Sequence, residues 1–294
     1  MTSTIFNAVL LPVALAIIML GLGLSLTLND FKRVAKYPKA ILIGLICQMF
    51  ILPLICFLIA KSFGLAPELA VGLMLLSASP GGPTANLYSH LSKGDVALNI
   101  SLTAVNSLLT LFTLPLIVNL SIGYFMVSGQ VIPLQFGKVV EVFAMVLIPV
   151  SIGMIVKAKF PKTSVIMDKP VKILSALFLV TIISGVIFQV RANILSYFEM
   201  VGFAALAFNL LSIGVGYYIP RLMKLEKRQA IAIGMEIGIH NGTLAIFIAL
   251  SILGNGVMSI PPVIYSLIMF FTGAAFGYIV NIKRKSAAEI IPST

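Results

Sequence analysis

The stretch "GMEIGIHNGT", residues 234–243, decides how this chain must be built. It puts a carboxylate, an imidazole and a carboxamide (Glu236, His240 and Asn241) in the middle of an apolar run, between "QAIAI" and "LAIFIALSIL". The run itself has the length and composition of a membrane-spanning helix. An ionised carboxylate at that depth costs at least ~2.5–3.5 kcal/mol unless it is paired. The stretch therefore predicts a spanning helix that is interrupted around a polar site.

The composition of the whole chain agrees with a membrane protein. Of its 294 residues, 60% are hydrophobic and only 10% are charged, and the mean hydropathy is +1.11. A soluble domain has roughly a quarter charged residues, and the alternating ten-residue segments of a transmembrane barrel are absent from the sequence. We predict an all-α polytopic membrane protein that forms a single transmembrane domain over residues 1–294. Nine transmembrane helices are expected, at residues 5–26, 40–63, 68–92, 96–122, 139–157, 171–190, 200–220, 228–254 and 261–280.

The first of these segments, residues 5–26, is expected to be a retained span. It is longer than the apolar core of a signal peptide, and it lacks a basic n-region and a small-residue cleavage site.

The basic residues that give the chain its net charge of +11 are concentrated in the loops expected on one side of the membrane. Alternate loops hold all of the twenty Lys and Arg residues except Lys61, Lys138 and Arg191. Basic loops stay in the cytoplasm, so we expect the N-terminus outside the inner (plasma) membrane and the C-terminus in the cytoplasm. This distribution makes anionic membrane lipid, and not nucleic acid, the expected partner of the basic residues.

A second interruption lies in the third span, in "SASPGGPTAN", residues 77–86. Two prolines and two glycines within residues 80–83 cannot continue an α-helix, so we expect a break over residues 79–86. Unwound backbone is not tolerated against lipid, because its polar groups would be unpaired. Both interrupted spans should therefore line an enclosed cavity.

The two breaks are placed like the corresponding parts of an internal repeat. A first half of about residues 1–126 and an inverted second half of about 136–282 would each contain one broken helix. Broken helices in corresponding positions of inverted halves indicate the midplane binding site of a secondary transporter. Half-helix N-termini suit an anion, and unwound carbonyls and carboxamides suit a hard cation such as Na⁺.

Glu236 is the acidic residue that needs the most explanation. The other eight acids lie in loops or close to span ends, and no Lys or Arg lies in a span core to pair with it. A cation that binds and leaves, a proton or a water-filled cavity must stabilise this carboxylate.

At this point the sequence resembles the bile acid:sodium symporter family, in its bacterial nine-span form. The likeness runs from "MLGLGLSLTLNDFKRVAKYPK" (residues 19–39) through "SASPGGPTANLYSHLSKGDVALNISLTAV" (77–105) to "GMEIGIHNGTLAI" (234–246). The resemblance implies a core and panel architecture whose two broken helices cross near the midplane. It also implies a symporter that couples Na⁺ to an organic anion, bile-acid-like or a small carboxylate, by alternating access.

The family pattern implies two sodium sites. For the first site, the matching residues are Ala85, Asn86, Asn99, Thr103 and Glu236, where Ala85 and Asn99 replace serines of the pattern. Asn99 and Thr103 are four residues apart and share a helix face. As an alternative, the Thr103 hydroxyl could simply bond the backbone of its own helix.

For the second site, the resemblance implies Gln48, Glu236 again, and the carbonyls of Ile237 and Ile239. His240 stands where the pattern has glutamine. Its imidazole is a poor Na⁺ ligand but titrates near neutrality. Three roles therefore stay open for His240: a structural residue, an altered sodium ligand or a proton sensor.

The substrate is expected at the faces of the crossing helices, against Thr84, Asn241, Gly242 and Thr243. Because no basic residue lies in a span core, helix termini and carboxamides would have to hold the anion. Aromatic and aliphatic walls would suit an acid that is partly apolar.

The alternatives to a sodium symporter are another kind of carrier and a membrane-embedded enzyme. A proton-coupled carrier, or a carrier of arsenite or another oxyanion that uses the thiol of Cys47, would share the fold. A membrane-embedded enzyme would need paired acids, a serine with a basic partner, or a zinc motif, and "EIGIH" lacks the second metal-binding histidine. We therefore do not expect an enzyme.

Overall fold

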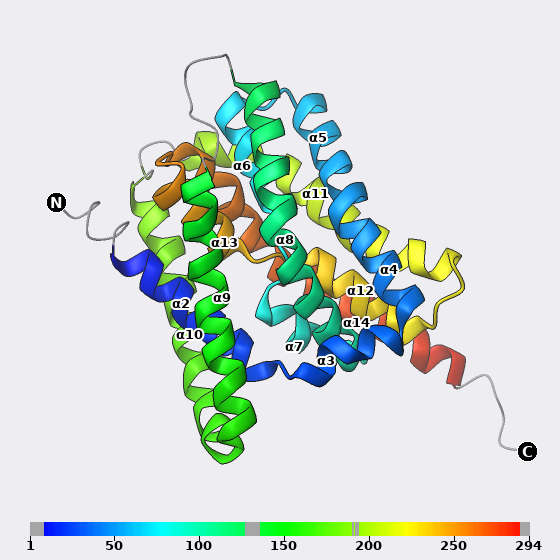
Figure 1. The fold of residues 1–294 in the computed structure, drawn as a ribbon. Coiled ribbons are helices and arrows are strands. Elements are labelled where there is room, and N and C mark those ends of the chain that lie inside the picture. The colour runs from blue at the N-terminus through cyan, green and yellow to red at the C-terminus, as the bar shows by residue number, and fades with distance from the viewer. Residues whose placement is uncertain (1–8, 127–135, 190, 192–193, 289–294) are drawn as a thin grey trace, which may run out of the picture.

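The computed structural model describes residues 9–126, 136–189, 191 and 194–288, and every secondary-structure element in these residues is a helix (Figure 1). Many large apolar side chains point outward, among them Phe50, Phe112, Phe203 and Phe271, each with about 70% or more of its surface exposed. Such a surface is suited to lipid and not to water. The expected all-α membrane protein is confirmed.

The first part of the chain crosses the structure twice before the first break. Helix α2 (Leu11–Ser25) is followed, at an angle of 69°, by α3 (Leu28–Lys32) and the short 3₁₀ helix η2 (Arg33–Ala35). Asp30 accepts from the backbone and hydroxyl of Thr27, which caps α3. A second apolar helix then runs through α4 (Pro38–Ile46), the π-helical turn η3 (Cys47–Ile51) and α5 (Leu52–Ser62).

The third predicted span is two helices, and the fourth is one. Helix α6 (Pro67–Ala78) ends at the first break and α7 (Pro83–Leu91) follows it. Helix α8 (Val96–Phe125) is capped by Asp95, whose carboxylate accepts from the backbone N–H of Leu98 at 3.1 Å.

The second part of the chain also contains a break between two helices. Three long helices, α9 (Phe136–Lys159), α10 (Pro161–Gln189) and α11 (Ile194–Leu222), precede α12 (Lys227–Gly238). After the second break come α13 (Gly242–Phe247), the π-helical turn η4 (Ile248–Ile252), the 3₁₀ turn η5 (Val257–Ser259) and α14 (Ile260–Ala288).

All nine predicted segments thus correspond to helices, but the number of spans stays a prediction. Within the described residues, six helices are long and apolar enough to cross a membrane, or seven if the bent pair of α2 with α3 and η2 counts as one span. Both broken spans consist of helices too short to qualify alone. Residues 5–8 of the first span and the predicted junction of the halves, at 127–135, lie outside the described part.

The helices gather in two groups. In Figure 1, α2 (blue), α9 and α10 (green) lie together on one side, and most of the remaining helices lie on the other. The backbones of α2 and α9 approach closely, because a Cβ at Gly23 would overlap Val150 and one at Gly153 would overlap Leu20. Lys157 of α9 also donates to the carbonyl of Ser25 at 2.5 Å, at the C-terminal end of α2.

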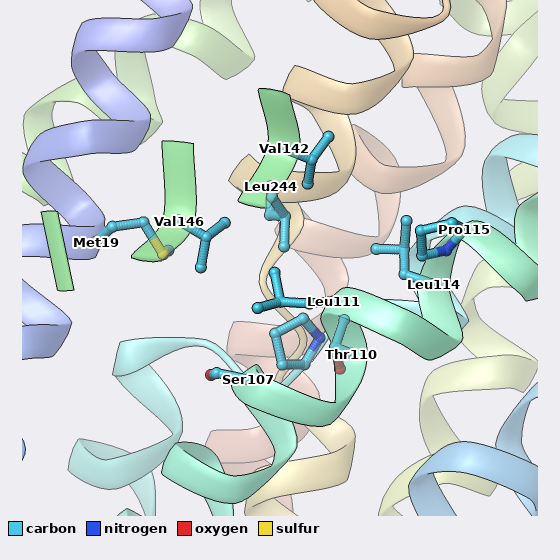
Figure 2. A pocket seen from close by; sticks show the side chains of 10 residues that line it. Met19, Ser107, Thr110, Leu111, Leu114, Pro115, Val142, Val146 and Leu244 are labelled. Atoms are coloured by element: carbon cyan, nitrogen blue, oxygen red, sulfur yellow. The ribbon is translucent and has the colours of Figure 1, made fainter. Parts of the chain in front are cut away.

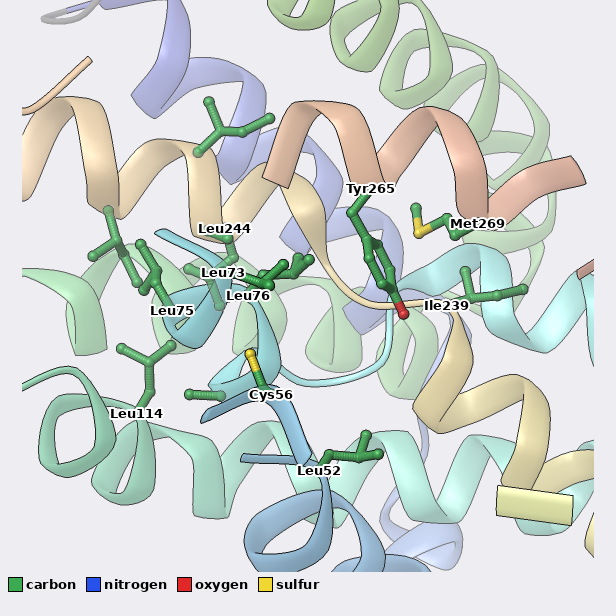
Figure 3. Close-up of a cluster of buried hydrophobic side chains, with 14 of the residues drawn as sticks. Leu52, Cys56, Leu73, Leu75, Leu76, Leu114, Ile239, Leu244, Tyr265 and Met269 are labelled. Atoms are coloured by element: carbon green, nitrogen blue, oxygen red, sulfur yellow. The ribbon is translucent and has the colours of Figure 1, made fainter. Parts of the chain in front are cut away.

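A continuous apolar core runs through both groups, and Figure 3 shows part of it around Tyr265, Leu73 and Leu244. Cys47 and Cys56 are both fully buried in this core as free thiols. They lie in apolar packing, as expected for cysteines in such a span.

Candidate functional site

The two breaks meet face to face in the interior. The backbone N–H of Gly82 donates to the carbonyl of Ile239 at 2.8 Å, and the N–H of Asn241 donates to the carbonyl of Pro80, also at 2.8 Å. Gly81 and His240 thereby form one antiparallel bridge between segments 159 residues apart. Each break supplies the hydrogen-bond partners that unwound backbone at this depth requires.

The first break is shorter than predicted. The expected interruption covered residues 79–86, whereas helix α6 ends at Ala78 and α7 already begins at Pro83. Proline at the first position of a helix costs nothing, because its missing N–H would have no partner there. Thr84, Ala85 and Asn86 therefore lie in the first turn of α7 and not in unwound chain.

The second break falls where it was predicted. Helix α12 ends at Gly238 and α13 begins at Gly242. The side-chain oxygen of Asn241 caps α13 by accepting from the N–H of Leu244 at 3.1 Å. Gly242 has no room for a side chain, since a Cβ there would overlap the hydroxyl of Ser266.

Glu236 lies in the last turn of α12 and is fully buried. The Thr103 hydroxyl of α8 donates to its Oε2 at 2.5 Å, and its Oε1 has no hydrogen-bond partner. A Cβ at Gly81 would overlap the carboxylate, so a side chain there would displace the end of Glu236. The carboxylate therefore lies directly at the meeting point of the two breaks.

Two carboxamides around the breaks, Gln48 and Asn99, are held by their nitrogen, and their oxygens have no hydrogen-bond partner. Gln48 Nε2 donates to the carbonyls of Ser79 (2.9 Å) and Ser77 (3.2 Å), and Asn99 Nδ2 donates to that of Ala232 (2.7 Å). The buried oxygens without a hydrogen-bond partner include Gln48 Oε1, Asn86 Oδ1, Asn99 Oδ1 and Glu236 Oε1. Oxygen ligands of this kind suit a hard cation.

The chemistry of the site is that of oxygen ligands and one acid. In the part of the chain that the structure describes, no three His, Cys, Asp or Glu side chains come close enough to hold a metal ion together. The residues present fit Na⁺ better than a transition metal, because amide, hydroxyl and carbonyl oxygens dominate.

The two carbonyls predicted for the second sodium site differ in their partners. In a continuous helix, the Ile237 carbonyl would accept from the N–H of Asn241, but that N–H donates to Pro80 instead. The break therefore takes away the helical donor of Ile237. The carbonyl of Ile239 accepts from Gly82 and keeps one lone pair.

His240 is almost completely buried at the bridge between the breaks. Its Nδ1 lies 3.2 Å from the carbonyl of Ser79, and its Nε2 has no partner. The imidazole stacks on Phe208, with ring centroids 5.8 Å apart and planes 14° apart. Packing and a hydrogen bond thus hold one side of the ring, while one nitrogen stays free.

A small cavity lies between the two helix groups (Figure 2). It is mostly apolar, and Ser107 and Thr110 of α8 supply its hydroxyls. Its lining comes from α2, α9, α8, the first break and α13: Met19, Pro80, Ser107, Thr110, Leu111, Leu114, Pro115, Val142, Val146 and Leu244.

None of the four residues expected to bind substrate lines this cavity. Asn241 and Thr243 are buried, Thr84 is partly exposed at the start of α7, and Gly242 packs against Ser266. The structure brings these residues to the two breaks, next to the candidate cation ligands, but not into the cavity.

Two polar residues of α8 near the site, Asn106 and Thr110, were not predicted from the sequence. Asn106 is fully buried and interacts with the Glu236 carboxylate, and its Nδ2 lacks a hydrogen-bond partner. Its Oδ1 accepts from Thr110 at 3.4 Å. The spacing of Asn99, Thr103, Asn106 and Thr110 continues one polar face along α8, and this periodicity was the signal that could have revealed Asn106 and Thr110.

Comparisons with known proteins identify the family of this chain. A model of the family described as "Sodium Bile acid symporter family" matches residues 12–197. A Bacillus subtilis protein named as a sodium-dependent transporter is 28% identical over 282 residues, which are 95% of this chain and 86% of that protein. The human ileal sodium/bile acid cotransporter is 27% identical over 289 residues, 95% of this chain and 82% of that protein.

A plant relative extends the range of named substrates. An Arabidopsis thaliana protein named as a chloroplast sodium/metabolite cotransporter is 28% identical over 279 residues, 94% of this chain and 67% of that protein. The relatives are transporters, and the chain is a multi-pass membrane transport protein and not an enzyme. The family model matches more than half of the sequence, and the chain belongs to the sodium bile acid symporter family.

Proposed function

We propose that this protein is a symporter that uses Na⁺ binding at the two breaks to drive transport of an organic anion. One observation carries the proposal: buried oxygens of Gln48, Asn86, Asn99 and Glu236 have no hydrogen-bond partner. A buried acceptor without a donor costs about 1–3 kcal/mol. A cation that binds these oxygens removes that cost and neutralises the one interior carboxylate.

The first sodium ion is assigned to Asn86, Asn99, Thr103 and Glu236. Thr103 already contacts the carboxylate, and the Asn99 amide is oriented by its bond to Ala232 of α12, the helix that carries Glu236. Ala85 contributes no side-chain oxygen, which leaves Asn99 to replace what a serine would give.

The second sodium ion is assigned to Gln48, Glu236 and the carbonyls of Ile237 and Ile239. The nitrogen of Gln48 is anchored on the first break, and the Ile237 carbonyl has lost its helical donor. His240 replaces an oxygen ligand with a nitrogen, so this second site should bind Na⁺ more weakly than the first.

The substrate is a carboxylate with an apolar body, either bile-acid-like or a smaller acid. Relatives are named as sodium/bile acid and sodium/metabolite cotransporters. Thr84, Asn241, Gly242 and Thr243 would supply its polar contacts, beside the N-terminal turn of α7, which favours an anion. The apolar lining of the neighbouring cavity suits the rest of such a molecule.

Transport would proceed by alternating access. The group of α2, α9 and α10 would rock against the group that contains the breaks, within two inverted halves of about residues 1–126 and 136–282. The basic loops favour the inner (plasma) membrane, with the N-terminus outside, the C-terminus in the cytoplasm and anionic lipid around the cytoplasmic loops.

A thermal-shift screen tests the proposal. The purified protein is heated with a bile acid, pantoate or a keto acid, in NaCl and in KCl of equal ionic strength. We expect stabilisation by one class of acid in Na⁺ and little in K⁺, followed by Na⁺-stimulated uptake of that acid into proteoliposomes.

The same screen separates the alternatives. Uptake driven by a proton gradient without Na⁺ would favour a proton-coupled carrier, and stabilisation by arsenite that depends on Cys47 would favour an oxyanion carrier. Either result would contradict sodium coupling.

A further inference from the structure

Two side chains outside the predicted ion ligands converge on one carbonyl of the second break. Tyr265 Oη of α14 and Asn209 Nδ2 of α11 both donate to the carbonyl of Gly238, each at 2.9 Å. All three residues are completely buried. Gly238 is the last residue of α12, two positions after Glu236, so both donors act at the point where the helix ends.

The Asn209 amide is itself oriented by a third residue. The hydroxyl of Thr272, on α14, donates to Asn209 Oδ1 in the shortest of the contacts that it makes. With its oxygen engaged by Thr272, the amide must present its nitrogen to Gly238. Thr272, Asn209 and Gly238 therefore form a continuous chain of hydrogen bonds from α14 through α11 to α12.

These bonds determine how the peptide groups of the break are oriented. Ile239 has non-helical dihedrals (φ −111°, ψ 83°), so no regular helix fixes the neighbouring carbonyls. The Gly238 carbonyl is bound on the side of α11 and α14, whereas the next carbonyl, of Ile239, accepts from Gly82 of the first break. Successive carbonyls are thus held by partners on different elements.

We propose that Asn209, Tyr265 and Thr272 are positioning residues for Na⁺. By binding the Gly238 carbonyl they keep this peptide group from rotating, and they hold the flanking carbonyls of Ile237 and Ile239 where the ion needs them. This inference rests on the proposed sodium symport. A preorganised site binds more tightly because less conformational freedom is lost when the ion binds, and supporting hydrogen bonds commonly tune ligands in this way.

The test compares two conservative variants, Tyr265→Phe and Thr272→Val, each of which removes a hydroxyl and keeps the shape. The measurement is the Na⁺ concentration that gives half-maximal thermal stabilisation of the purified full-length protein. We expect an increase of about tenfold for each variant, equivalent to about 1.4 kcal/mol, with little change of melting temperature in K⁺ alone.

Two controls accompany these variants. Tyr88→Phe removes the same hydroxyl from another bond to a backbone carbonyl, that of Phe270 at 3.1 Å, which belongs to neither break, and should leave the Na⁺ concentration unchanged. Thr272→Ser keeps the hydroxyl and should restore the wild-type value.

The outcomes distinguish the positioning role from the function itself. If Tyr265→Phe and Thr272→Val bind Na⁺ within twofold of wild type while Glu236→Gln loses it, the positioning role is wrong and the sodium site stands. If they lower the melting temperature equally in Na⁺ and K⁺ at unchanged Na⁺ affinity, their role is structural and the proposal is again wrong. If Glu236→Gln binds Na⁺ like the wild type, the proposed function fails first.

Discussion

Thr103 and Glu236 are 133 residues apart in the chain, and the hydroxyl of the first lies 2.5 Å from the carboxylate of the second. This contact ties α8 to the end of α12 at the depth where the two breaks meet. The other carboxylate oxygen, Oε1, has no hydrogen-bond partner. The protein therefore binds one carboxylate oxygen of Glu236, and the other oxygen is available to an ion.

Glu236→Gln should abolish stabilisation by Na⁺ and Na⁺-driven uptake. The substitution removes the negative charge of Glu236, so the remaining neutral oxygens of the site cannot offset the cost of dehydrating the ion. The protein should still insert, because a neutral side chain is less costly in the membrane. Calorimetry with NaCl measures the effect, and Glu199→Gln, an exposed acid, is the control. Wild-type Na⁺ affinity in Glu236→Gln would refute the assignment.

Thr103→Val should weaken Na⁺ binding by about tenfold or more, since a hydrogen bond to a charged group contributes about 1.5–3 kcal/mol. Thr103→Ser keeps the hydroxyl and should remain within a few-fold of wild type. The comparison uses the Na⁺ dose response of uptake in proteoliposomes. Equal losses in both variants would show that the hydroxyl does not by itself account for the effect, and would contradict this prediction.

Asn106→Leu should reduce Na⁺ affinity although sequence reasoning did not select this residue. The substitution places an apolar side chain beside the carboxylate and takes away the acceptor of Thr110. A several-fold increase in the half-maximal Na⁺ concentration is expected. Ser121→Ala on the same helix, which loses only a bond to its own backbone, should have no effect. An unchanged dose response would confine Asn106 to a packing role.

His240→Gln should strengthen Na⁺ binding and make the dose response steeper, because a carboxamide oxygen replaces the imidazole nitrogen near the carbonyls of Ile237 and Ile239. The gain competes with lost stacking on Phe208, so the melting temperature in K⁺ is measured alongside. The same affinity and Hill slope as wild type would show that His240 is structural.

Cysteine labelling tests the orientation in the membrane. On a background without Cys47 and Cys56, Gly256→Cys should react with a membrane-impermeant maleimide from outside intact cells, and Thr163→Cys should not. Gly256 is exposed and has open space for a side chain, and Thr163 is exposed beyond the end of α9. Labelling of Thr163→Cys from outside would reverse the predicted topology.

Much of the fold could be predicted from the local sequence, because long apolar runs and helix-breaking residues act within a few positions. The second break was located correctly from Gly238 and Gly242. The predicted first break is too long, because the prediction treats Pro83 as a residue that interrupts a helix. Proline is in fact well suited to the first position of a helix. A sequence pattern alone does not tell whether a proline ends one helix or begins the next.

The residue types of the candidate site could be predicted from the sequence, but the hydrogen bonds that these residues make could not. A lone Glu236 and a lone Gln48 in apolar runs each called for partners, and the structure gives Gln48 two carbonyls of the first break. The chain from Thr272 through Asn209 to Gly238 could not be foreseen, because it joins helices that are distant in sequence. Which atom of an amide is engaged depends on packing, and packing is not a local property.

The bridge between Gly81 and His240 has a consequence for how this fold can diverge. The two bonds of this bridge, from Gly82 to Ile239 and from Asn241 to Pro80, connect main-chain atoms, so side-chain replacements at these positions do not remove their donors or acceptors. Only a residue without an N–H, proline at position 82 or 241, would remove one directly. The main-chain bridge can therefore stay the same while the candidate ligands around it differ, as the resemblance to the family implies for Ala85, Asn99 and His240.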